Sequence, residues 1–237
     1  MPRHARLAIS DISYHITQRG NYQQNVFLTE KDQALYLGLV VRAACDYGLA
    51  LLGWCFMTNH VHWIVTPSER SSMAFTFRRA HSQYSVFVNG VHHRRRGHLW
   101  QSRFYSCPLS EHHLFAALAY VERNPVRANL AFEAENYPWS SASAHTGRQP
   151  SPPFLCLKPW SDLHSPETWR AFLKTQSASE EDALRARTAH GKPWGDEAFA
   201  ASLEEKAGRY LRPRPRGRPC LGSATHAAGS GILISAQ

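Results

Sequence analysis

Residues 51–65 read LLGWCFMTNHVHWIV, which is two apolar segments on either side of a short polar link. Apolar segments of this length, separated by Thr58-Asn59, favour two strands joined by a tight turn. Because successive side chains of a strand point to opposite faces, His60 and His62 would project from one face of the second strand. Two imidazoles at this spacing can reach a single divalent cation. With 14 histidines in the chain, the spacing can also arise by chance.

The apolar pattern on both sides of this hairpin predicts the order strand, helix, strand, strand, helix, strand, helix. Strands are expected at 12–17, 51–57, 61–65 and 104–109, and helices at 31–47, 73–87 and 111–124. Ser110 would cap the last helix and Pro125 would end it. This order predicts an α+β fold with a ferredoxin-like or RRM-like split βαβ antiparallel sheet, its helices on one face.

The composition changes near Gly147. We expect a compact domain over residues 1–146 and a proline-rich linker over 147–159. A small helical appendage would follow over 160–211, with helices around 168–174 and 196–207. Residues 212–237 would form a basic tail that is disordered, because its repeated prolines exclude an ordinary helix or sheet.

The charge balance favours a polyanionic partner. Among 237 residues, 27 Lys and Arg stand against 18 Asp and Glu, which gives a net charge of +9. A basic surface gains free energy by displacing counterions from nucleic acid. The same charge could also mean an acidic membrane surface or no specific partner.

The five cysteines are scattered, odd in number and without a C-x-x-C pair, which excludes a disulfide framework and a zinc ribbon. They indicate reduced thiols in a cytoplasmic protein. We expect neither a secretory signal nor a membrane span, because no apolar run is long enough.

Tyr120 is the candidate nucleophile. It shares a helix face with Asn124, four residues on, and lies beside an apolar stripe that would dock the helix on the sheet. A tyrosine in this place can equally be a core residue with its hydroxyl at the rim. Its ordinary pKa of about 10 makes it a weak nucleophile, but a divalent cation that polarises a phosphodiester lowers the demand on it. Attack would give a covalent phosphotyrosine, and Asn124 could add an oxygen ligand to the two histidines.

Four ordered motifs then resemble a known family: YHITQRGN at 14–21, MTNHVH at 57–62, WQSRF at 100–104 and YVERNPVRA at 120–128. Together they are similar to the REP-associated tyrosine transposases, relatives of the single-tyrosine HUH transposases of bacterial insertion sequences. The resemblance covers roughly residues 1–145.

The resemblance implies an HUH nuclease fold with His60 and His62 as metal ligands and Tyr120 as the nucleophile. It implies Mg²⁺ or Mn²⁺ as cofactor, and places Asn124 where related enzymes carry a polar residue beside the metal, often the longer glutamine. Such enzymes cut single-stranded DNA beside a REP-like hairpin and leave a 5′-phosphotyrosine and a free 3′-hydroxyl. The chain would be nucleoid-associated and either a monomer or a homodimer.

Basic and aromatic residues supply the candidate DNA contacts. An arginine cluster between the second helix and Trp100 is expected to track phosphates, or to be a solvated loop. Trp100, Phe104 and Tyr105 could stack on unpaired bases or pack in the core. Arg216-Gly217-Arg218 resembles an AT-hook that lies in a narrow minor groove, with a disordered tail as the alternative. The complete set of predicted DNA-binding residues is Arg78, Arg79, Arg94, Arg95, Arg96, Trp100, Arg103, Arg216 and Arg218.

Two other functions stay open at this point. A hairpin-binding regulator would keep the fold and charge with little catalysis, but would not need His60, His62 and Tyr120 together. A replication initiator or relaxase shares the paired histidines, but resembles a pattern with lysine four residues after the tyrosine. Asn124 stands there instead.

Overall fold

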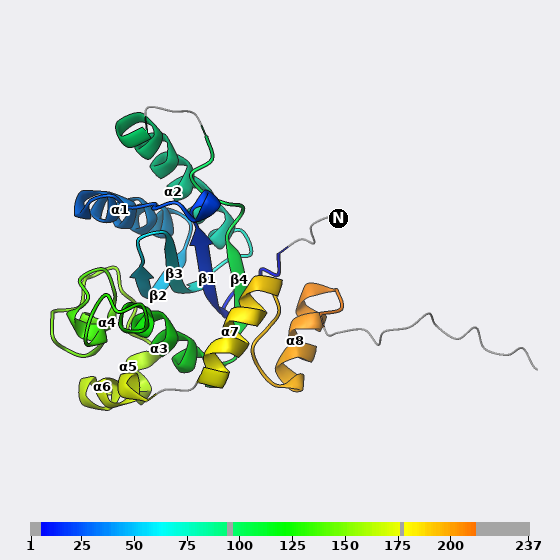
Figure 1. The fold of residues 1–237 in the computed structure, drawn as a ribbon. Helices are drawn as coiled ribbons and strands as arrows, with labels where there is room; N and C mark the ends of the chain where they lie inside the picture. Colours follow the sequence, from blue (N-terminus) through cyan, green and yellow to red (C-terminus); the bar gives the residue numbers. More distant parts are fainter. Residues whose placement is uncertain (1–5, 94–96, 176–177, 212–237) are drawn as a thin grey trace, which may run out of the picture.

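The computed structural model describes residues 6–93, 97–175 and 178–211. Its centre is a four-stranded antiparallel sheet of β1 (Ser13–Arg19), β2 (Leu49–Phe56), β3 (His60–Pro67) and β4 (Tyr105–Leu109). The strand order is β2-β3-β1-β4, so the first strand of the chain lies between the third and the fourth (Figure 1). The predicted α+β fold with an antiparallel sheet is confirmed, and so is the β2–β3 hairpin around Thr58-Asn59.

The long helices follow the predicted positions closely. They are α1 (Glu30–Asp46), α2 (Ser72–Val88) and α3 (Glu111–Arg127). The capping box of Thr29 and Asp32 fixes the start of α1, because each side chain satisfies a free backbone N–H of the other residue. The shorter elements are η1 (Asn21–Gln23), η2 (Asn89–His93), η3 (Ala134–Asn136), α4 (Ala142–His145), α5 (Trp160–Leu163), α6 (Pro166–Lys174), α7 (Ala178–His190) and α8 (Glu197–Ala207).

Helices cover both faces of the sheet, so the expectation of helices on one face was wrong. Figure 1 shows α1 and α2 on one side and α3 with the C-terminal helices on the other. The reason is in the strands themselves: Val61, Trp63 and Val65 of β3 are fully buried on one face, and so is Ile64 on the other. A strand that is apolar on both faces needs a layer of structure on each.

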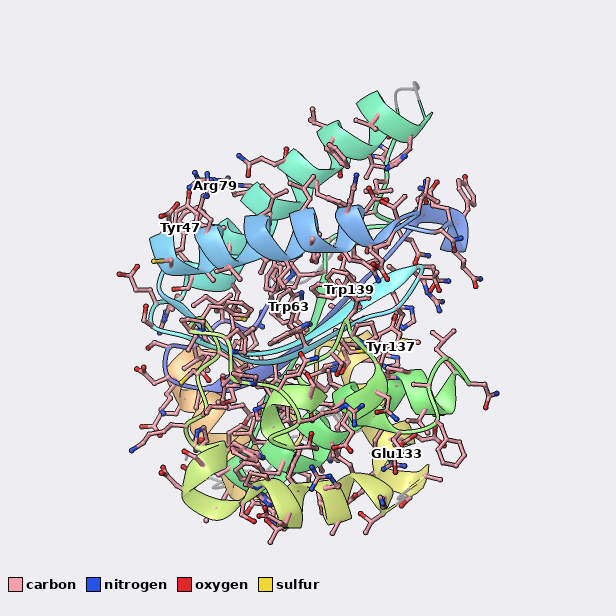
Figure 2. The ribbon with its side chains drawn as sticks, turned by 90° about the vertical axis from the view of Figure 1, so that its left-hand side faces the viewer. Tyr47, Trp63, Arg79, Glu133, Tyr137 and Trp139 are labelled. Carbon is pink, nitrogen blue, oxygen red and sulfur yellow. The ribbon has the colours of Figure 1, made fainter. Side chains whose placement is uncertain are left out.

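The α1–α2 side holds the aromatic core. Trp63 points from the sheet towards α1 (Figure 2), and its ring lies 6.4 Å from that of Tyr36. Tyr36 in turn packs against Phe56 and Tyr84. This closely packed core holds the backbone of β3 in place, and so fixes the positions of the residues on its opposite face.

The opposite face receives α3. Leu118 of this helix lies so close to Gly53 of β2 that a Cβ atom at position 53 would collide with it. The close approach brings α3 against the face of the sheet that carries His60 and His62.

Pro125 does not end α3, which continues to Arg127. Proline removes the N–H that would bond to the carbonyl of Val121. The Asn124 side chain compensates, because its Nδ2 donates to that carbonyl at 3.3 Å and to the Tyr120 carbonyl at 3.0 Å. The helix therefore carries one more turn than predicted, and Arg127 lies on it.

Residues 147–211 pack directly on this unit. Leu155 forms a β-bridge with Leu51, and Trp194 forms one with Leu109. Trp169 of α6 donates its indole N–H to the buried carboxylate of Glu122 on α3 at 2.8 Å. Within the described residues, no helix is both long and apolar enough to cross a membrane.

Candidate active site

His60 and His62 lie side by side on the α3 face of β3, with ring centroids 4.9 Å apart. The Asn59 amide oxygen can only accept, so the Nδ1–H of His60 donates to it at 2.6 Å. The Nε2 of His60 therefore carries a free lone pair. The Nε2 of His62 is buried, and no hydrogen-bond partner for it exists among the described residues. A buried polar atom of this kind fits a ligand that the chain itself does not supply.

Both imidazoles are neutral at physiological pH. Burial, together with the positive charges of Arg19 and Arg127, lowers the pKa of His60 to about 4. Burial also lowers the pKa of His62 well below 6.5, with further lowering by His60 and His15. Neutral imidazole is the form that binds metals.

These lowered pKa values predict an acid-sensitive fold. Below a pH of about 6.5 the unfolded chain protonates its histidines, whereas folded His15, with a pKa of about 3, does not. The unfolded state then binds more protons, so the free energy of unfolding falls as the pH falls. At pH 5.5, urea unfolding of the metal-free chain should show a loss of about 1 kcal/mol for each such histidine relative to pH 7.5.

His15→Gln, which does not titrate, should reduce that loss. A free energy of unfolding that stays constant or rises as the pH falls from 7.5 to 5.5 would contradict the assignment of these histidines as neutral.

Tyr120 lies on α3 and points towards the face of the sheet that carries the two histidines. Its ring lies 5.7 Å from that of His62 at an interplanar angle of 90°, and 5.8 Å from that of His15. The residue is 5 % exposed. The phenol and the His62 imidazole, which the sequence placed on separate elements, are thus in contact, although Tyr120 is buried.

Arg127 contacts the Tyr120 hydroxyl. Its Nη2 lies 3.5 Å from that hydroxyl and donates to the Asn124 amide oxygen at 2.8 Å. The guanidinium also lies over the phenol ring, 4.9 Å from its centroid. Sequence reasoning missed Arg127 because it ended the helix at Asn124. Its spacing, seven residues after Tyr120, places both on one helix face and could have indicated it.

Helix α7 covers this cluster from outside. The Glu181 carboxylate binds Arg127 at 2.9 Å and Arg123 at 3.4 Å, and the Arg185 guanidinium lies 5.8 Å from the centroid of the Tyr120 ring. A cavity of about 740 Å³ opens beside them, lined by Arg123, Arg127, Arg170 and Lys174 among others. Arg127 therefore stands between the phenol and the cavity.

Comparison with known families decides the identity of this unit. Residues 8–124 match the family model described as "Transposase IS200 like". These residues form an IS200-like transposase domain. The resemblance to the REP-associated tyrosine transposases is confirmed at the level of the IS200-like transposase family.

One solved structure supports the fold of the transposase domain. The structure of a REP-associated tyrosine transposase bound to a REP hairpin superposes with a TM-score of 0.52 at 17 % identity, covering 66 % of this chain and 92 % of that one. A candidate transposase from Deinococcus radiodurans, at 21 % identity, covers 52 % and 97 % with a TM-score of 0.33. A tRNA(His) guanylyltransferase from Saccharomyces cerevisiae, at 10 % identity, covers 83 % and 84 % with a TM-score of 0.39. The last two scores are too low to indicate a shared fold. No curated protein sequence is significantly similar to the chain.

The transposase domain offers two neutral histidine side chains that could bind a metal, and a third protein ligand would be of another kind. Among the described residues, no three His, Cys, Asp or Glu side chains converge on one point that could hold a metal ion. The amide oxygen of Asn124 is the predicted third ligand, and here it accepts from Arg127. A carbonyl oxygen has two lone pairs, so this bond leaves one of them for a cation.

The predicted DNA-binding residues of the transposase domain fall into different environments. Trp100 is only 9 % exposed and its ring packs 4.6 Å from that of His81, which supports the core-packing alternative over a DNA contact. Phe104 is also buried, whereas Tyr105 is exposed and stays available for stacking.

The arginines predicted to bind DNA also lie in different environments. Arg103 is exposed. Arg78 is an exposed residue of α2. Arg79, also on α2, pairs with Asp46 at 2.6 Å. Figure 2 shows Arg79 on the α1–α2 side of the sheet, whereas the histidines lie on the α3 side. Arg94, Arg95, Arg96, Arg216 and Arg218 lie outside the described residues.

Proposed function

We propose that the chain cuts and rejoins single-stranded DNA beside REP-like hairpins, with Tyr120 as the nucleophile. The observation that carries this proposal is the edge-on contact of Tyr120 with His62, between a helix and a strand that meet only in the folded chain. The hairpin-bound REP-associated transposase supports a hairpin as the DNA partner.

The donor set of the site fits a divalent cation such as Mg²⁺ or Mn²⁺. His60 and His62 each offer a neutral Nε2 lone pair, and Asn124 offers an amide oxygen. A bound cation would act as a Lewis acid and neutralise the charge of the phosphodiester that is attacked. Because these cations prefer oxygen ligands and six-fold coordination, water and a phosphate oxygen would complete the shell.

The chain's own residues account for the nucleophile. Arg127 lies beside the Tyr120 hydroxyl and stabilises the phenolate that develops as the phenol loses its proton. The Tyr120 oxygen forms a bond to phosphorus while the bond from phosphorus to the 3′-oxygen breaks. The 3′-oxygen takes up a proton, which leaves a 5′-phosphotyrosine and a free 3′-hydroxyl. Rejoining is the reverse step with the 3′-hydroxyl of another strand.

DNA must displace part of the cover over Tyr120. Glu181 occupies Arg127, and a DNA phosphate can compete for that guanidinium because it offers the same bidentate acceptor geometry. The Arg127 side chain is 39 % exposed towards the cavity, so a phosphate could reach it from that side. Loss of the Glu181 contacts would free the first turn of α7, which carries Glu181, to move from the phenol.

The burial of Tyr120 favours one alternative, a hairpin-binding regulator in which α7 stays closed. This alternative predicts binding without chemistry. The two functions therefore differ in a covalent product.

A labelled hairpin oligonucleotide separates the two functions. Incubated with Mn²⁺, a single-stranded hairpin with flanking unpaired bases should give a denaturation-resistant adduct that keeps a label at the 3′ end of the DNA. A label at the 5′ end should leave with the free 3′-hydroxyl fragment, and a fully paired duplex of the same sequence should give no adduct. Hairpin binding without an adduct would establish the regulator instead.

A further inference from the structure

His15 of β1 links the candidate metal ligand His62 to helix α7. Its Nε2 lies 2.9 Å from the Nδ1 of His62, and its Nδ1 lies 2.8 Å from the Oγ1 of Thr188. All three side chains are buried. The three residues come from β1, β3 and α7, so the fold assembles this chain of hydrogen bonds from distant parts of the sequence.

Two arrangements of the hydrogens are possible along this chain. If Thr188 donates to His15 and His15 donates to His62, the Nε2 of His62 carries a hydrogen. That N–H would be buried, and no acceptor for it exists among the described residues. If the direction is reversed, His62 donates from Nδ1 to His15, and His15 donates from Nδ1 to Thr188. His62 then keeps a bare lone pair on Nε2.

The second arrangement is the favoured one. A buried N–H without an acceptor is rarer and costlier in proteins than an acceptor without a donor. The Thr188 hydroxyl accepts at the end of the chain and keeps its own hydrogen for another acceptor.

We propose that His15 and Thr188 are positioning residues that hold His62 in the tautomer with a bare Nε2 directed at the metal site. The proposal rests on the proposed function, in which His62 is a metal ligand. Metal-binding histidines commonly donate their other N–H to a fixed acceptor, which sets the ring orientation and the tautomer. Here α7 supplies the terminal acceptor, so residues 178–190 take part in the metal site without touching the metal.

Thr188→Val tests this proposal, because it removes the hydroxyl and keeps the shape of the side chain. In the metal-free chain at neutral pH, long-range ¹H–¹⁵N NMR of labelled histidine should show His62 protonated at Nδ1. Thr188→Val should mix the two tautomers, and Mn²⁺ affinity measured by EPR should fall about tenfold. Thr188→Ser restores the hydroxyl and should restore both results.

Thr76→Val is the matched control. Thr76 is a buried threonine on α2, across the sheet, and its hydroxyl bonds to the Ala43 carbonyl. Its loss should leave the His62 tautomer and the Mn²⁺ affinity unchanged.

The outcomes separate this proposal from the proposed function. Protonation of His62 at Nε2 in the metal-free wild type would overturn the proposal and needs no variant that must fold. Unchanged Mn²⁺ affinity and tautomer in Thr188→Val would also overturn it. A wild type with the expected tautomer that binds no Mn²⁺ would support the positioning of His62 and refute the proposed metal-dependent chemistry.

Discussion

Tyr120→Phe should form no covalent adduct with single-stranded hairpin DNA and should bind the hairpin as tightly as the wild type. The change removes only the hydroxyl, so the ring keeps its contacts with His15, His62 and Arg127. Without the oxygen no bond to phosphorus can form, and loss of a catalytic nucleophile lowers rates by about 10³-fold or more. Adduct formation on denaturing gels and hairpin affinity by fluorescence anisotropy measure the two effects.

Tyr137→Phe is the control, because it also removes a tyrosine hydroxyl on the α3 side of the sheet. Its hydroxyl donates to the Phe56 carbonyl at 2.7 Å, and its removal should leave adduct formation intact. Adducts at the wild-type rate in Tyr120→Phe would show that another residue is the nucleophile.

His60→Ala should remove metal-dependent cleavage. The two neutral Nε2 atoms are the nitrogen ligands that the site offers. His60→Ala leaves only His62 and the Asn124 amide oxygen, which are too few protein ligands to hold a labile divalent cation in place. We expect cleavage at fixed Mn²⁺ to fall about 100-fold or more, because a direct ligand contributes at least as much as the outer residues around a metal. His60 is a suitable target because it lies at the edge of the cluster, half-buried, so its loss leaves the core intact.

His112→Ala is the control, because His112 is exposed at the start of α3. It should cleave as the wild type does. Cleavage that persists in EDTA, or that His60→Ala does not change, would refute the metal role.

The sequence predicted the parts of the site that depend on local periodicity. The two-residue period of β3 placed His60 and His62 on one face, and helical spacing placed Tyr120 beside the apolar stripe of α3. Both follow from backbone geometry alone. Contact between the two elements could not be read from the pattern, since it depends on how closely α3 approaches Gly53.

Two kinds of residue escaped prediction. Arg127 was missed because Pro125 is normally a helix terminator, and only the Asn124 side chain, which bonds to the freed carbonyl, lets the helix continue. Thr188 lies 173 residues from His15, so no local pattern relates them. A buried hydroxyl at the end of a hydrogen-bond chain has no signal in a single sequence.

Aromatic residues beside basic ones were ambiguous for a different reason. Trp100 follows a basic cluster and reads equally as a base-stacking residue or as core. The structure places it against His81 and Tyr36, because the sheet is apolar on both faces and needs large side chains on the α1–α2 side as well.

Peptide mapping of the covalent adduct tests the central claim most directly, that Tyr120 is the residue joined to DNA. After trypsin and nuclease digestion of the adduct formed on a hairpin oligonucleotide, fragmentation of the peptide ending at Arg123 should locate the residual phosphonucleotide. The account predicts it on Tyr120. Its location on Tyr105 of the same peptide, or on any other residue, would contradict the account.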